Sequence, residues 1–181
     1  MTTTIHAHRR MQSFSLVEVS VGLAISGVLL SQAVPSVAQL QQRQRLEAVA
    51  QTLMTDLQQA RSEAVQRADA VQLRFSQHAK GSCYVMHTGA SGQCRYEEEG
   101  SAVCTANAQI LKFEWLPSSR KLSIRANVSN MSFQARQGTV TSTGSIDVAS
   151  ASGTAIRHVV SIAGRIRSCA PDGPLKHLPK C

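Results

Sequence analysis

The sequence predicts an α+β chain in which one long N-terminal helix, first apolar and then amphipathic, packs on a β-rich globular head. Three observations lead to this prediction. Residues 19–42 carry no charged side chain, residues 46–64 repeat apolar side chains at helical spacing, and residues 71–162 alternate apolar with polar side chains between turn-forming residues. Because the first two patterns adjoin, they describe one continuous helix, and the third describes the head.

A short basic leader occupies residues 1–13. It contains Arg9 and Arg10 and no acidic residue, a bias that keeps such a segment on the cytoplasmic side of a membrane. The apolar stretch that follows approaches the roughly 20 residues needed to span a bilayer. We therefore expect a transmembrane helix segment at 14–37 and an amphipathic stem helix at 38–67. A plain signal anchor or an uncleaved transmembrane helix is the alternative.

A lone carboxylate stands at the head of this apolar stretch, where an ionisable group is costly and usually has a partner or a function. Together, Phe14, Glu18 and Pro35 resemble the signal of type IV pilins and pseudopilins, with Ser13 where Gly is usual. The resemblance implies that a prepilin peptidase cuts between Ser13 and Phe14, that the new N-terminus is methylated, and that Glu18 pairs with the terminal amine of a neighbouring subunit. Because proline removes a helical donor, a kink or local melting is expected at Pro35.

The stem helix is expected to end near Arg67 and to present one apolar face. The residues of this face are Leu46, Val49, Leu53, Leu57, Ala60 and Ala64. Asp56 and Arg61 are among the polar residues assigned to the other faces. The head, 68–181, can bury one modest core, and the only tryptophan, Trp115, is expected in it. The expected strands are Val71–Phe75, Cys83–His87, Ile110–Leu116, Lys121–Ala126, Met131–Arg136, Ser145–Ala149 and Ala155–Ile162.

The end of the stem carries a more specific pattern. Ala60-Arg61-Ser62-Glu63-Ala64 resembles the segment that closes the long helix in the GspH/FimT pseudopilin family. We assign Arg61 and Glu63 a structural role, either solvated or in local pairs. The resemblance implies a pilin-like fold, other pilins as partners, and a chain held in the bacterial inner membrane with its head in the periplasm before it joins a pilus at the cell surface. We expect its place in the pilus to be at or near the tip.

Five cysteines, at 83, 94, 104, 169 and 181, all follow the apolar segment. A head in the periplasm would allow disulfides to persist, and the spacing is not that of a zinc site. The sequence favours a bridge between Cys169 and Cys181. The second pair, among Cys83, Cys94 and Cys104, stays open, with one odd thiol left over.

The formal charge is +8, and removal of the leader lowers it to +6, a balance that favours anionic partners. In the basic tail 164–181, Gly164-Arg165-x-Arg167 resembles the DNA-binding motif of the FimT branch, minor pilins that help capture DNA for natural transformation. Alternation places the two arginines on one face of an extended segment. Lys176 and Lys180 are expected to add contacts to the phosphates of double-stranded DNA. Such binding is independent of sequence and sensitive to salt.

The alternative for the two arginines is structural, since charges on an edge strand prevent pairing with neighbouring sheets. His158 and His177 are expected to add positive charge at mildly acidic pH. No set of residues suggests catalysis, a metal or a cofactor, so we expect no enzyme activity. Two other functions stay open. One is a GspH-like minor pseudopilin of type II secretion, and the other is a minor pilin that only primes pilus assembly.

Overall fold

The computed structural model describes residues 15–97, 100–171, 175 and 177–181. The chain divides into two compact units, Met1–Gln41 and Gln42–Cys181. Helix α1, Leu16–Arg67, begins in the first unit and ends in the second. Its end at Arg67 is the one expected from the sequence.

In the first unit, α1 continues without a break through Pro35, so the local melting expected at this proline is not seen. Glu18 is exposed in the first turn, where the helix dipole favours a negative charge. Among the described residues, no stretch of helix combines the length and the apolar character needed to cross a membrane. The transmembrane segment at 14–37 stays a prediction.

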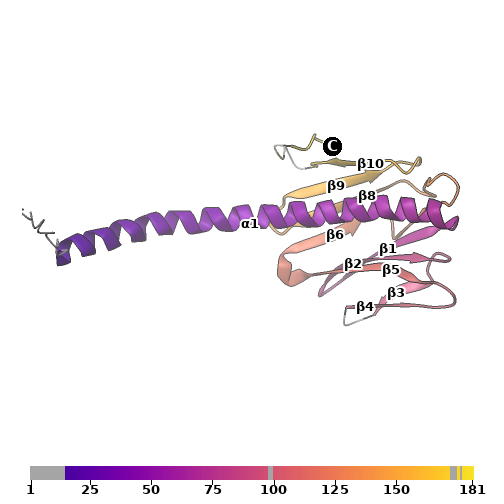
Figure 1. Cartoon of the computed structure of the whole chain (residues 1–181), viewed down its shortest axis with the longest axis horizontal. Coiled ribbons are helices and arrows are strands. Elements are labelled where there is room, and N and C mark those ends of the chain that lie inside the picture. The colour runs from indigo at the N-terminus through magenta and orange to yellow at the C-terminus, as the bar shows by residue number, and fades with distance from the viewer. Residues whose placement is uncertain (1–14, 98–99, 172–174, 176) are drawn as a thin grey trace, which may run out of the picture. The chain divides into compact units, whose positions relative to one another are not determined.

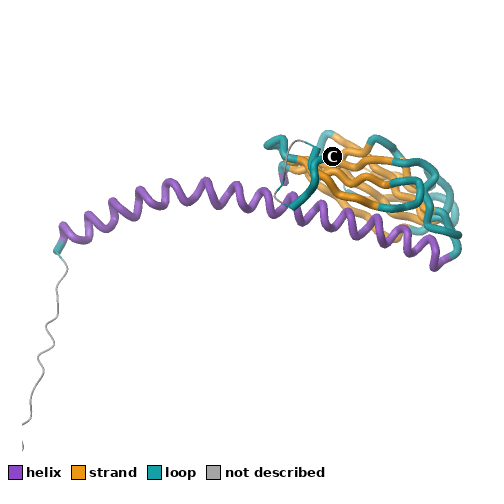
Figure 2. Tube along the Cα trace, turned by 90° about the horizontal axis from the view of Figure 1, so that it is seen from above, coloured by secondary structure: helices purple, strands orange, loops and turns teal. Residues whose placement is uncertain are grey.

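In the second unit, the remainder of α1 lies along one side of two antiparallel four-stranded sheets (Figures 1 and 2). The first sheet has the order β5-β2-β1-β7, with β1 Val71–His78, β2 Gly81–Thr88, β5 Ile110–Pro117 and β7 Asn130–Phe133. The second has the order β10-β9-β8-β6, with β6 Leu122–Ala126, β8 Gly144–Ser150, β9 Ala155–Val160 and β10 Ile166–Cys169. A short hairpin pairs β3, Cys94–Glu97, with β4, Ser101–Cys104.

All seven expected strands are present, with ends that differ by a few residues. Three strands were not expected, namely β3, β4 and β10. The hairpin strands are short, and their sequences, Cys94–Glu97 and Ser101–Cys104, contain few of the alternating apolar residues that mark a strand. The third, β10, lies within the segment interpreted as a basic tail.

The core lies between α1 and the inner faces of both sheets. The helix contributes buried residues at spacings of three and four, which are Leu46, Ala50, Leu53, Leu57, Ala60 and Ala64. This is the expected face, except that Ala50 is fully buried and Val49 only partly. Leu53 and Leu57 have no exposed surface, and full burial of each such side chain stabilises the fold by about 1.5–3 kcal/mol.

Asp56 is also on the buried face of the helix, which makes its assignment to a polar face wrong. The side chain is 2% exposed. It accepts a hydrogen bond from the Tyr84 hydroxyl and one from Lys112 Nζ at 2.7 Å. Burial and the neighbouring Asp56 raise the pKa of Tyr84 well above its usual range. The carboxylate thus ties α1 to β2 and β5, and a partner for each oxygen offsets the cost of its burial.

Trp115 is half-buried rather than part of the core, so that expectation is wrong too. It lies on the outer face of the first sheet, where the ring of Tyr96 from the β3–β4 hairpin stacks on it at 4.9 Å. The disulfide Cys94–Cys104 joins the two strands of that hairpin. Cys83, paired with Trp115 across β2 and β5, is the buried free thiol. Burial raises its pKa to about 11.

Candidate functional site

Part of the predicted site lies outside the described residues, namely Ser13, Phe14 and Lys176. The other basic residues, Arg165, Arg167 and Lys180, are exposed, and we call these three the basic edge. Arg167 lies in β10, which is the strand at one end of the second sheet. The first part of the expected tail is therefore a strand of the sheet and the turn before it.

The turn between β9 and β10 holds Arg165 in place. The Ser161 N–H donates to the Arg165 carbonyl at 3.0 Å, and the Gly164 N–H donates to the Ser161 carbonyl at 2.8 Å. Gly164 is buried with a φ of +71°, a conformation that favours glycine. A Cβ at this position would stand 2.0 Å from the Gly138 carbonyl oxygen. The close approach that Gly164 allows is therefore to the protein's own backbone.

Side chains alternate along β10. Ile166 packs against the core, and the Ser168 hydroxyl lies 2.8 Å from His158 Nδ1. Because alternate residues of a strand point to opposite faces, Arg167 points outward between them. His158 is 1% exposed, and burial lowers its pKa. The expectation that His158 adds positive charge to this region is wrong.

Lys180 lies in the C-terminal segment, which a disulfide closes into a loop. A disulfide joins Cys169 to Cys181, with the two Cα atoms 5.0 Å apart. Ala170 forms a parallel bridge with Lys180, and the Cys181 N–H donates to the Ala170 carbonyl at 3.2 Å. Lys180 therefore lies beside the residue that follows β10, on the same margin of the sheet as Arg167.

Within the described part of the chain, the side chains of Arg165, Arg167 and Lys180 form no ion pair or hydrogen bond. Exposed cations without a partner keep their full positive potential, which attracts anions. Phosphate and carboxylate are the anions that a guanidinium recognises with two parallel hydrogen bonds. The basic edge is thus equipped to bind phosphates by charge and geometry.

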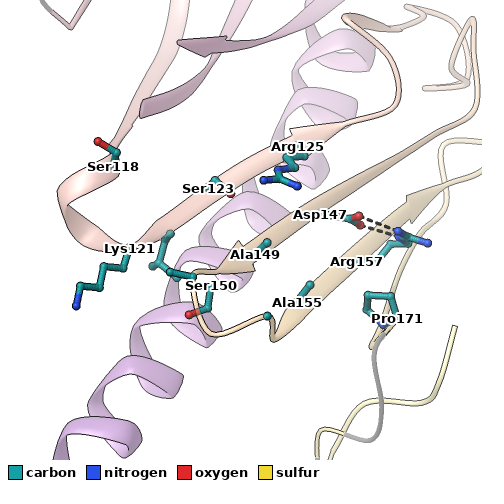
Figure 3. A pocket seen from close by; sticks show the side chains of 13 residues that line it. Ser118, Lys121, Ser123, Arg125, Asp147, Ala149, Ser150, Ala155, Arg157 and Pro171 are labelled. Atoms are coloured by element: carbon teal, nitrogen blue, oxygen red, sulfur yellow. Dashed lines mark hydrogen bonds and ion pairs between the residues drawn. The ribbon is translucent and has the colours of Figure 1, made fainter. Parts of the chain in front are cut away.

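A second basic region lies on the outer face of the same sheet, in a hollow of about 570 Å³ (Figure 3). Lys121 and Arg125 rim it, and small residues such as Ala149 and Ala155 line it. Arg157 also lines it, but this guanidinium is bound to the Asp147 carboxylate at 2.6 and 2.7 Å. The carboxylate in its wall makes this hollow a weaker anion site than the basic edge.

A second hollow, of about 700 Å³, lies between the end of α1 and the β9–β10 turn. We call it the helix-end hollow. Arg61 of α1 and Arg165 both line it. The sequence analysis interprets these two arginines separately, and the fold brings them to one site.

Among the described residues, no group of three or more His, Cys, Asp or Glu side chains is placed to hold a metal ion. His87 is buried and held by the Thr88 carbonyl at 2.9 Å from Nδ1, and His177 lies 3.6 Å from a Glu47 oxygen.

A family model matches most of the second unit. The model of Type II transport protein GspH matches residues 49–164. The chain belongs to this family. The match begins within α1 and ends at Gly164, so the GspH family relationship covers the last part of the helix, both sheets up to β9 and the glycine of the turn. The residues of the basic edge lie beyond the matched range.

Solved structures of other proteins resemble this GspH family member. The type IV minor pilin FimU of Pseudomonas aeruginosa strain PAO1 superposes with a TM-score of 0.55 at 22% identity, covering 72% of this chain and 96% of that one. The minor pseudopilin EpsH of the type 2 secretion system of Vibrio cholerae gives a TM-score of 0.46 at 12% identity, covering 70% and 98%. Comparison with curated protein sequences gives no significant match. At 22% identity the likeness to FimU shows the fold, which is that of a pilin-like α+β protein.

Proposed function

We propose that this chain is a minor pilin that joins a type IV pilus and binds double-stranded DNA through its basic edge, for uptake in natural transformation. In this respect it is closest to the FimT branch of its family. The leader 1–13 is removed by a prepilin peptidase between Ser13 and Phe14, and the helix then holds the chain in the inner membrane with its head in the periplasm. On assembly, Glu18 pairs with the terminal amine of a neighbouring pilin, and Pro35 lies within the packed helix of the filament.

The observation that carries the DNA proposal is the placement of Arg165 and Arg167. Both are exposed, and neither side chain has a polar partner among the described residues. They flank half-buried Ile166 at the start of β10, and Cα atoms two residues apart on extended backbone lie about 6.5 Å from each other. This spacing suits neighbouring phosphates of one DNA strand. A strand and a tight turn hold both residues, which reduces the entropy lost on binding.

The chemistry predicts the mode of binding. Contacts to phosphates position a protein on DNA but carry no sequence information. Each phosphate neutralised releases counterions, so the logarithm of affinity falls with the logarithm of salt concentration by about 0.9 per contact. The affinity is therefore expected to be independent of DNA sequence and to fall steeply as the salt concentration rises. The described part of the basic edge has no aromatic ring, which argues against a preference for single strands.

The test is duplex binding by the oxidised full chain in a neutral detergent, followed by fluorescence anisotropy over a salt series. Two labelled duplexes of unrelated sequence are compared. The Arg165→Ala/Arg167→Ala variant is expected to lose most of the affinity and to lower the salt slope by about 2. Far-UV circular dichroism checks that the variant is folded. Absence of binding by the wild type at low salt would rule out the DNA proposal.

A second candidate is a minor pseudopilin of type II secretion, which the description of the matched family favours. A third is a minor pilin that primes assembly without a ligand. Deletion of the gene in its natural host separates them. Loss of transformation with pili retained supports DNA capture, loss of protein secretion supports the pseudopilin, and loss of pili supports the priming role.

A further inference from the structure

The helix-end hollow adds a cation to the binding surface that the sequence did not assign. Its polar lining comes from three segments far apart in the chain. These are α1, the loop after β7 and the β9–β10 turn, which contribute Gln58, Arg61, Ser62, Gln66, Gln137 and Arg165. None of its lining residues is acidic. Glu63, the acid nearest in sequence, is bound to Arg67 at 2.6 Å.

Two glycines bring Arg61 to this place. A Cβ added at Gly138 would stand 2.6 Å from Arg61 Cγ, and one added at Gly164 would stand 3.2 Å from Arg61 Nε. The aliphatic part of the Arg61 side chain therefore packs directly on the backbone of both glycines. Because Gly164 directly precedes Arg165, the same contact that seats Arg61 sets the two guanidinium groups along one hollow.

We propose that Arg61 and Arg165 together clamp a phosphate of the DNA backbone in the helix-end hollow, so that the DNA-binding surface continues from β10 onto the last turns of α1. This inference rests on the proposed function. Two like charges along one wall repel each other unless an anion lies between them. A phosphate oxygen accepts hydrogen bonds from both guanidinium groups, and the glutamine amides and the Ser62 hydroxyl offer further donors.

The volume fits this ligand class. A hollow of about 700 Å³ lies within the range of sites that hold small organic ligands, so it has room for a phosphate and its flanking sugars. A simple packing role for Arg61 is the competing explanation. In that case the charge of Arg61 has no effect on DNA binding, and only the packing of its aliphatic part on the two glycines matters.

The experiment uses the oxidised full chain in neutral detergent and the same labelled duplexes and salt series. Arg61→Gln removes the charge and keeps part of the aliphatic side chain. It is expected to raise Kd about three- to tenfold and to lower the salt slope by about 1. Arg61→Lys keeps the aliphatic side chain and the charge but cannot form two parallel hydrogen bonds to a phosphate. The salt slope of this variant is therefore expected to equal that of the wild type. Arg45→Ala, an exposed arginine earlier on the same helix, is the matched control and is expected to bind like wild type.

The outcomes separate the two proposals. If Arg61→Gln is folded by circular dichroism and binds like Arg45→Ala, while Arg165→Ala/Arg167→Ala has lost binding, the clamp is wrong and DNA binding stands. If Arg61→Lys loses as much slope as Arg61→Gln, the effect does not come from charge and the clamp is also wrong. If the wild type binds no duplex, the proposed function fails and the clamp with it.

Discussion

Replacing Gly164 by alanine tests the tight packing on which both proposed binding surfaces depend. The backbone there has a φ of +71°, and the new Cβ would stand 2.0 Å from the Gly138 carbonyl oxygen. The left-handed conformation costs an alanine about 1–2 kcal/mol. The steric conflict is with backbone, which cannot rotate away, and overpacking of this kind costs about 1–3 kcal/mol. We expect Gly164→Ala to lower the free energy of unfolding by about 2–5 kcal/mol.

Gly153→Ala is the matched control for this prediction. Gly153 has a φ of +90°, with nothing within 4 Å of a built Cβ. It therefore carries the conformational cost alone, about 1–2 kcal/mol. Urea unfolding of the oxidised chain, followed by the fluorescence of the single tryptophan, Trp115, measures both variants on one scale. Equal losses in the two variants would refute the packing of Gly164 on Gly138.

Two further predictions concern buried ionisable groups. Burial lowers the pKa of His87 and of His158 in the folded protein. As the pH falls below about 6.5, these histidines therefore become protonated in the unfolded chain before they do so in the folded protein. The free energy of unfolding is expected to fall there by at most about 1.4 kcal/mol per histidine per pH unit. Urea unfolding at pH 7.5 and 5.5 measures this, and equal stability at both would contradict it. Asp56→Ala is expected to lower the free energy of unfolding by about 3 kcal/mol, because it leaves Lys112 and the Tyr84 hydroxyl without their partner. Glu63→Ala, which breaks an exposed pair, is the control and is expected to cost about 0.5 kcal/mol or less in the same assay.

The sequence predicts the elements with strong periodicity. The stem helix, its apolar face and the seven alternating strands follow from residue spacing, because burial on one side of a helix or sheet imposes that spacing. The hairpin over Trp115 could not be predicted in this way. A disulfide and an aromatic stack hold it, and neither leaves a periodic signal.

The candidate site was predicted only in part. The Gly164-Arg165-x-Arg167 pattern identified the exposed arginines, but alternation alone did not show that Gly164 is buried. Arg61 was assigned a structural role, because spacing along one helix says nothing about which loop meets its end. That meeting depends on the contact of two glycines, Gly138 and Gly164, which are distant in the sequence.

The order of the strands along the chain has a consequence for folding. The apolar face of α1 between Leu46 and Ala64 is covered by strands that all follow it, and β1 pairs with β7 as well as with its sequence neighbour. Such pairing between distant segments makes folding slow. During synthesis the helix is complete long before the strands, so its apolar face stays open to other chains until the strands have docked. A chain stopped before residue 166 keeps the helix and loses the margin of the sheet, which makes aggregation its expected fate.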